Sequence, residues 1–174
     1  MEDVNAYRLY ALQCHLNLEN FVNMFITRYI QKSIYNGPRE YYSDFEDLIL
    51  NDIAFSKKIK IISQIFKDKN KNDVLLEIFS SKFVFNNKNE VTEVNIHGRI
   101  FKVNDLIKHL ERVNAIRNHL AHSFYIFDPN EREDLAPFKN SKVDINLKGD
   151  RSQLDESHKY AVEFLHGLSL ELSK

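Results

Sequence analysis

The sequence predicts a mainly α-helical protein, an up-and-down bundle with a small β-hairpin-like insertion before its C-terminal helix. Apolar residues recur at alternating steps of three and four over long stretches, which is the spacing of one buried helix face. The 174 residues include only four Gly and three Pro, so few positions break a helix. With 43% hydrophobic residues the chain can build one sizeable core. We therefore assign residues 1–174 to a single domain.

The composition narrows the possible classes of function. The single cysteine, Cys14, cannot form a disulfide within the chain. No apolar run reaches the roughly eighteen residues that a membrane-spanning helix needs. We therefore expect a cytoplasmic protein without a membrane anchor. The formal net charge of −1 provides no overall attraction for nucleic acid, so any RNA binding must come from local basic patches.

The first predicted helix runs from Asp3 to about Tyr35. Leu9, Leu12 and Leu16 lie off its apolar stripe, which suggests that a second side of the helix is covered by the bundle or by a dimer partner. Asn36-Gly37-Pro38 then ends the helix, because Gly adopts the left-handed conformation and Pro cannot continue the hydrogen-bond ladder. The stripe itself consists of Val4, Tyr7, Ala11, Cys14, Leu18, Phe21 and Phe25.

Two short amphipathic helices are predicted next, over Asp44–Ile53 and Phe55–Lys67. The first carries acidic residues that could pair with an arginine or form a solvent face: Asp44, Glu46 and Asp47. The second begins the most basic stretch of the chain: Lys57, Lys58, Lys60, Lys67, Lys69 and Lys71. This stretch is either a solvated face or a surface that contacts RNA phosphates, and in the second case Lys57, Lys60 and Lys67 are the candidate RNA-binding residues.

The middle of the chain carries weaker signals. A helix is predicted over 73–83 and a polar loop over 86–89. Within residues 93–103, apolar residues recur on both sides of His97-Gly98. This segment is therefore either a small hairpin or an irregular lead-in to the next helix.

The last fifty residues change character. Tyr125-Ile126-Phe127 and the alternation of Val143, Ile145 and Leu147 predict two short strands, joined by a loop that holds Pro129 and Pro137. The two strands could pair as a small antiparallel flap. Gly149 to Ser152 is expected to form a turn. A C-terminal helix is then expected from about Gln153 to Leu172.

The helix predicted from about Asn104 to Ser123 carries the residues that point to a function. Arg117 falls within its apolar arc, where an unpaired guanidinium would cost several kcal/mol to bury. We expect Arg117 to face a carboxylate, a subunit interface or a cleft that receives an anion. Asn114, Asn118 and His122 form a polar strip beside it. The apolar positions of this helix are Leu106, Leu110, Val113, Leu120 and Phe124.

The run Arg117-Asn118-His119-Leu120-Ala121-His122 resembles the signature of HEPN domains, an arginine followed after four to six residues by a histidine. In that family the motif lies on a late helix of an all-α bundle. The specific match covers these six residues, and the general architecture about the first 125. The resemblance implies a metal-independent endoribonuclease without a cofactor, as in toxin–antitoxin pairs and anti-phage defence. Alternatively, it implies an inactive dimeric member that binds a nucleotide or a protein.

An arginine and a histidine are sufficient for cleavage of single-stranded RNA, because the 2′-hydroxyl is the nucleophile. His122 could move the proton, Arg117 could bind phosphate oxygens, and Asn118 could orient the histidine or the scissile phosphate. On a regular helix Arg117 and His122 point roughly 140° apart. Either the helix frays after Leu120, or a two-fold homodimer brings two motif helices to one cleft, as the HEPN resemblance implies.

Two observations bear on the subtype and on alternative sites. In HEPN toxins controlled by a partner nucleotidyltransferase, a tyrosine follows the histidine by two residues, whereas here Phe124 holds that place and Tyr125 follows. This weakens the prediction of that kind of antitoxin partner and leaves a stand-alone defence or stress ribonuclease equally open. His119 is expected to be exposed or structural. No set of metal ligands is predicted around it.

Overall fold

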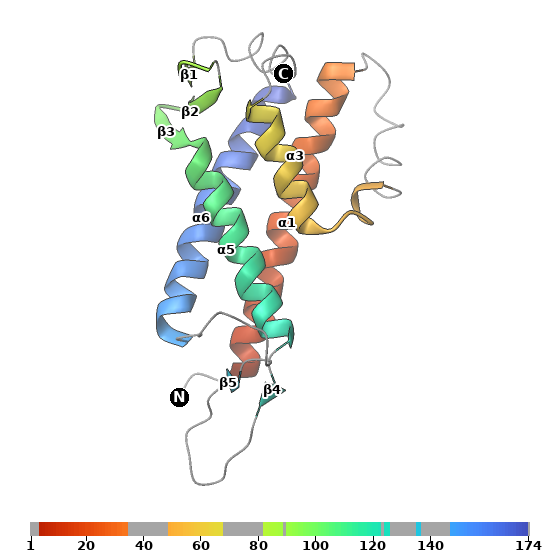
Figure 1. The fold of residues 1–174 in the computed structure, drawn as a ribbon, viewed down its shortest axis with the longest axis vertical. Helices are drawn as coiled ribbons and strands as arrows, with labels where there is room; N and C mark the ends of the chain where they lie inside the picture. The colour runs from red at the N-terminus through yellow and green to blue at the C-terminus, as the bar shows by residue number, and fades with distance from the viewer. Residues whose placement is uncertain are drawn as a thin grey trace.

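The computed structural model describes residues 4–34, 49–67, 82–88, 90–122, 124–125, 135–136 and 147–173. They form a helical bundle with a small three-stranded antiparallel sheet before the C-terminal helix (Figure 1), which confirms the predicted class. None of the helices in these ranges is both long and apolar enough to span a membrane. The helices are α1 (Val4–Ile34), α3 (Phe55–Lys67), α5 (Val103–His122) and α6 (Leu147–Leu172).

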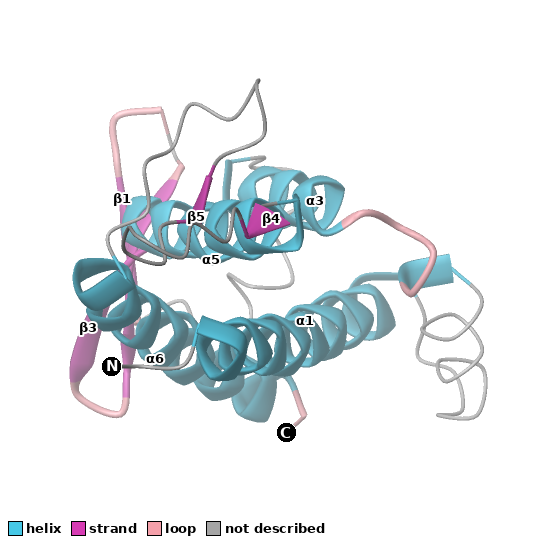
Figure 2. Cartoon of the chain, turned by 90° about the horizontal axis from the view of Figure 1, so that it is seen from below, coloured by secondary structure: helices cyan, strands magenta, loops and turns pink. Residues whose placement is uncertain are grey.

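The helices lie in two layers, α1 beside α6 and α3 beside α5 (Figure 2). Helix α5 runs opposite to α1 and α6 and contacts both, so the core lies between the layers (Figure 1). The predicted apolar stripes face this core, and Leu18, Leu110 and Phe164 are among its fully buried side chains. The sequence pattern therefore predicts that burial of these stripes is the main source of the protein's stability.

The predicted helices agree with α1, α3 and α5 to within one or two residues where they are described. The C-terminal helix differs, because α6 begins at Leu147 and the predicted turn at Gly149 to Ser152 is helical. One glycine costs a helix only about 1 kcal/mol. Two contacts attach the first half of α6 to the bundle. Leu154 is buried, and Asp155 accepts a 2.7 Å hydrogen bond from the Tyr10 hydroxyl.

The predicted helix Asp44–Ile53 does not extend to Ile53. Residues 44–48 lie outside the described residues, as do residues 36–38, and the helical conformation seen at Ile49 ends at Leu50. A turn follows, closed by a 3.1 Å hydrogen bond from the Ile53 N–H to the Leu50 carbonyl. The Asn23 amide donates a 3.1 Å hydrogen bond to Asn51 Oδ1, which attaches this turn to α1.

The sheet consists of β1 (Phe83–Phe85), β2 (Val91–Ile96) and β3 (Arg99–Lys102), in that order and antiparallel. The hairpin alternative is therefore confirmed, and its two-residue turn has positive φ at His97 (51°) and Gly98 (84°), as tight hairpin turns require. The helix predicted over 73–83 is wrong at its end, because Phe83 begins β1. Residues 73–81 lie outside the described residues. Strand β1 has only three residues, which is too short for the alternation of a strand to appear in the sequence.

A second pair of strands joins β4 (Phe124–Tyr125) to β5 (Leu135–Ala136). The partner of β4 in the described residues therefore lies within the predicted loop, and Leu147, the last residue of the second predicted strand, begins α6 instead. Residues 126–127 and 141–146 lie outside the described residues.

The short length of α3 positions the site. With 13 residues against 31 in α1 and 20 in α5, α3 covers only part of the groove between its neighbours. It begins beside the C-terminal third of α5, where its first residues line a pocket together with Arg117 and Asn118 (Figure 1).

Substitution of Gly167, at the contact between α6 and β2, tests the packing of the sheet. An added Cβ would lie 2.6 Å from Cγ2 of Ile96. We expect Gly167→Ala to lower the free energy of unfolding in denaturant titrations. The steric overlap should cost about 1–3 kcal/mol, which exceeds the gain of about 1 kcal/mol from the higher helix propensity of Ala. In an Ile96→Ala background the same substitution should stabilise. A Gly167→Ala effect of the same sign in both backgrounds would contradict this contact.

Candidate functional site

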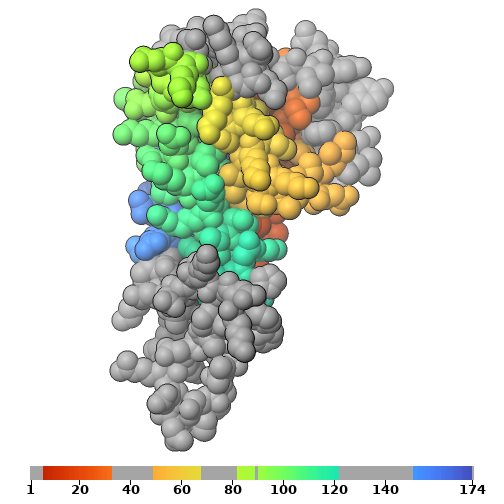
Figure 3. Space-filling model, viewed as in Figure 1, coloured from red at the N-terminus to blue at the C-terminus, as the bar shows by residue number. Residues whose placement is uncertain are grey.

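An open pocket of about 440 Å³ lies where α3 begins. Helix α1 contributes His15 and Glu19, and α5 contributes Arg117 and Asn118. The turn before α3 and the first residues of α3 complete the wall. Figure 3 shows the face on which α3 and α5 lie side by side. Three helices that are distant in sequence therefore bring polar side chains to one opening.

Arg117 is half-buried in this pocket. Its Nη1 donates a 2.8 Å hydrogen bond to Asn118 Oδ1, and its Nε is buried without a hydrogen-bond partner in the described part of the chain. No carboxylate among the described residues lies within ion-pair distance of the guanidinium. Arg117 therefore opens on a pocket and has no carboxylate partner among the described residues, while the predicted anion and the predicted subunit interface stay predictions. The predicted acidic partners lie outside the described residues: Asp44, Glu46 and Asp47.

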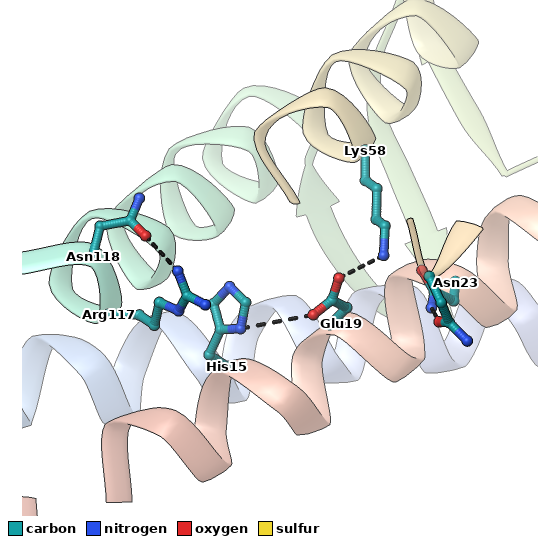
Figure 4. A network of polar contacts seen from close by, with 7 residues as sticks. His15, Glu19, Asn23, Lys58, Arg117 and Asn118 are labelled. Atoms are coloured by element: carbon teal, nitrogen blue, oxygen red, sulfur yellow. Dashed lines mark hydrogen bonds and ion pairs between the residues drawn. The ribbon is translucent and has the colours of Figure 1, made fainter. Parts of the chain in front are cut away.

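His15 lies on α1 between Arg117 and Glu19 (Figure 4). It is only 4% exposed, its Nδ1 is 3.9 Å from Glu19 Oε2, and its Nε2 is buried without a partner in the described residues. Burial lowers the pKa of His15, and the positive charges of Arg117 and Lys58 act in the same direction. Glu19 and the Asn114 side chain oppose this shift only in part. The imidazole is therefore neutral at pH 7.

Glu19 also binds a buried lysine. Lys58 of α3 is 0% exposed, and its Nζ lies 2.5 Å from Glu19 Oε1. Figure 4 shows the resulting line of polar groups from Asn118 through Arg117 and His15 to Glu19 and Lys58. Lys58 therefore does not belong to a solvated lysine face, unlike its neighbours in the basic stretch.

The predicted catalytic residues are brought together only in part. Arg117 and Asn118 share the pocket, and their hydrogen bond shows that Asn118 orients the arginine. Helix α5 remains helical to His122, so the predicted fraying after Leu120 does not occur. The side chain of His122 is not among those described. The predicted RNA-binding residues are exposed on α3 and do not line the pocket: Lys57, Lys60 and Lys67.

Sequence reasoning missed His15 and Glu19. Cys14, which precedes His15 and lies on the predicted apolar stripe, is buried as predicted, and burial raises the pKa of that thiol. The signal that could have identified the pair is an ionisable residue at each of two positions four apart, beside the apolar stripe. His119, which was expected to be exposed or structural, is buried.

The pocket combines a permanently charged donor, amide side chains and a neutral imidazole. Such a set can bind a phosphodiester and can also accept or donate a proton. Among the described residues, no three His, Cys, Asp or Glu side chains are arranged to hold a metal ion. No protein-family model, no curated protein and no solved structure matches the chain. Function must therefore be inferred from the pocket itself.

The Glu19–Lys58 pair should show unequal costs when either partner is removed. We expect Glu19→Leu to destabilise by about 3–5 kcal/mol, because it strands a fully buried ammonium. Lys58→Met should cost less, because the Glu19 side chain is 23% exposed and water can reach it. The double variant Glu19→Leu/Lys58→Met should recover most of the loss. Equal losses that add in the double variant, measured by denaturant titration, would show that the two groups do not depend on each other.

Proposed function

We propose that the protein is a metal-independent endoribonuclease of the HEPN type that cleaves single-stranded RNA. The observation that carries the proposal is Arg117: it is half-buried and opens on a pocket, and no described carboxylate pairs with it. A guanidinium in this position is suited to bind a phosphate, whose oxygens match its forked donors. The HEPN resemblance of the surrounding residues adds the reaction class.

In the proposed reaction Arg117 binds the scissile phosphodiester, and Asn118 holds the guanidinium in place. The RNA 2′-oxygen attacks phosphorus, the bond to the 5′-oxygen breaks, and the products are a 2′,3′-cyclic phosphate and a 5′-hydroxyl. Arg117 stabilises the charge that develops on the phosphorane oxygens. His122 accepts or donates the transferred proton. Lys57, Lys60 and Lys67 would extend the RNA path along α3.

A two-fold homodimer belongs to this proposal, because positions 117 and 122 lie about 140° apart around a continuous helix. A second α5 can supply the missing histidine to each pocket. The exposed leucines of α1 support such an interface, since they form an apolar stripe on the outer side of the helix. Their exposed fractions are 58% for Leu9, 39% for Leu12 and 60% for Leu16. We place this dimer in the cytoplasm, in a toxin, defence or stress context.

The same separation of Arg117 and His122 favours a second candidate. A chain that acts as a monomer keeps the anion pocket but has no His122 beside it. Such a protein would be a non-catalytic binding module for a nucleotide or a protein, and RNA cleavage by the pure protein distinguishes the two.

Cleavage assays test the reaction. We expect the pure protein to cut single-stranded RNA in EDTA and to leave 2′,3′-cyclic ends, because neither proposed group needs a metal. Arg117→Ala and His122→Ala should each lower the rate about a hundredfold to a thousandfold. Arg112→Ala is the matched control, since Arg112 is exposed on the same helix and does not line the pocket. Cleavage of fully 2′-O-methylated RNA, or a requirement for divalent metal, would refute the mechanism.

Sedimentation at micromolar concentration tests the dimer. We expect Leu16→Glu to yield a folded monomer with little activity, whereas Ile100→Glu, at a side chain 61% exposed on β3, should leave the dimer intact. Leu120 is unsuitable for this test, because it lies in the core of the protomer.

Mixing the Arg117→Ala and His122→Ala proteins should restore about one quarter of parent activity, since half of the dimers then hold one intact composite site. A fully active monomer, or no recovery on mixing, would contradict the composite site.

A further inference from the structure

Helix α3 begins in the pocket without a side-chain cap. The residue before its first turn is Ala54, where Ser, Thr, Asp or Asn usually accepts a hydrogen bond from a free backbone N–H. The Ala54 carbonyl accepts the N–H groups of Lys57 at 2.8 Å and Lys58 at 3.3 Å. The N–H groups of Phe55 and Ser56 have no acceptor in the part of the chain that the structure describes. Ala54, Phe55 and Ser56 all line the pocket.

A second, independent feature of the same pocket indicates a ligand. His15 is more than nine-tenths buried and lines the pocket, yet its Nε2 has no partner among the described residues. The Nε of Arg117 is likewise buried and without a partner there. Leaving such nitrogens unsatisfied costs free energy, so they favour a ligand with several acceptor oxygens.

The charges around the pocket limit the kind of anion that fits. Arg117 contributes one positive charge, and the N-terminus of α3 adds roughly half a positive charge. Glu19 is neutralised by Lys58 at 2.5 Å, and Asp52 is exposed to water on the turn. This modest positive excess matches a phosphodiester, which carries one negative charge. A polyphosphate carries several negative charges, which this excess would not balance.

We propose that the uncapped N-terminus of α3 is a phosphodiester-binding subsite, in which the Phe55 and Ser56 amides bind the phosphate that Arg117 contacts. The assignment of this phosphate to RNA rests on the proposed ribonuclease function. Helix N-termini bind phosphate in this way because free N–H groups and the helix dipole act together. The unpartnered Nε2 of His15, on the facing helix, lies in the same pocket, where a hydrogen bond to the bound group or to the adjoining ribose would satisfy it.

A cap introduced at Ala54 tests the subsite. In Ala54→Asp the new carboxylate would accept the free N–H groups and occupy the place of the phosphate. We expect the melting temperature to rise by about 2–4 °C, as a helix cap does, and affinity for RNA to fall at least about tenfold. Because the variant is more stable than the parent, its loss of binding cannot come from unfolding. The probe is a labelled, fully 2′-O-methylated single-stranded RNA, which cannot be cleaved, with the dissociation constant measured by fluorescence anisotropy at one salt concentration.

Two further variants separate the contributions. Ala54→Asn caps the helix without a charge, so it should weaken RNA binding less than Ala54→Asp. Ala6→Asp makes the same change at an exposed position in the first turn of α1, away from the pocket, and should leave RNA affinity unchanged. Unchanged RNA affinity in Ala54→Asp, or an equal loss in Ala6→Asp, would overturn the subsite.

Competition distinguishes RNA from free nucleotides as the source of the phosphate. Adenosine 5′-monophosphate and inorganic phosphate should displace the labelled RNA only at concentrations at least about a hundredfold above that of unlabelled RNA. Equal competition by the mononucleotide would overturn the assignment to a strand. The subsite and the ribonuclease proposal can also fail separately. If the parent binds but never cleaves RNA, and Ala54→Asp weakens binding, the subsite stands and the ribonuclease proposal fails. If the parent cleaves RNA and Ala54→Asp binds RNA as well as the parent does, the ribonuclease proposal stands and the subsite fails.

Discussion

Lys58 is fully buried, and its ammonium lies 2.5 Å from Glu19, so α3 can pack on α1 only where this contact is kept. A buried ammonium without a carboxylate would cost several kcal/mol, far more than a change in apolar packing of one methylene. The pair therefore determines where along α1 the short helix α3 lies. Because Lys58 is in the first turns of α3, the same contact also determines where the N-terminus of α3 faces the groove. The pocket depends on this constraint.

The pocket combines groups that would be weak separately. Arg117 is permanently charged, His15 is neutral because burial lowers its pKa, and the first amides of α3 are uncapped. Each carries unsatisfied hydrogen-bonding capacity, which a folded protein tolerates where a ligand can satisfy it. A phosphodiester would satisfy all three at once. Placing them on three different helices makes the bundle itself the scaffold of the site, which favours a preformed geometry.

The geometry of α5 sets the main condition on the proposed catalysis. The helix is continuous through His122, and positions 117 and 122 lie about 140° apart around it. The proposed dimer would remove this difficulty and would also cover the exposed leucines of α1. His15 offers a different imidazole, on the opposite wall of the same pocket and in the same protomer. The roles proposed for the two histidines can therefore be separated, since the proposed role of His122 depends on association and that of His15 does not.

The sequence by itself determined the helical class, the bounds of α1, α3 and α5, and the burial of Cys14, because these depend on the local spacing of apolar residues. It also indicated that Arg117 faces something other than a simple core. Only the tertiary structure decided that Lys58 is buried while its neighbours are exposed, and that His15 lies beside Arg117. The pairing of β4 with β5 was likewise settled by long-range packing. Such contacts join residues far apart in the chain, and periodicity along a sequence holds no information about which distant helix lies opposite.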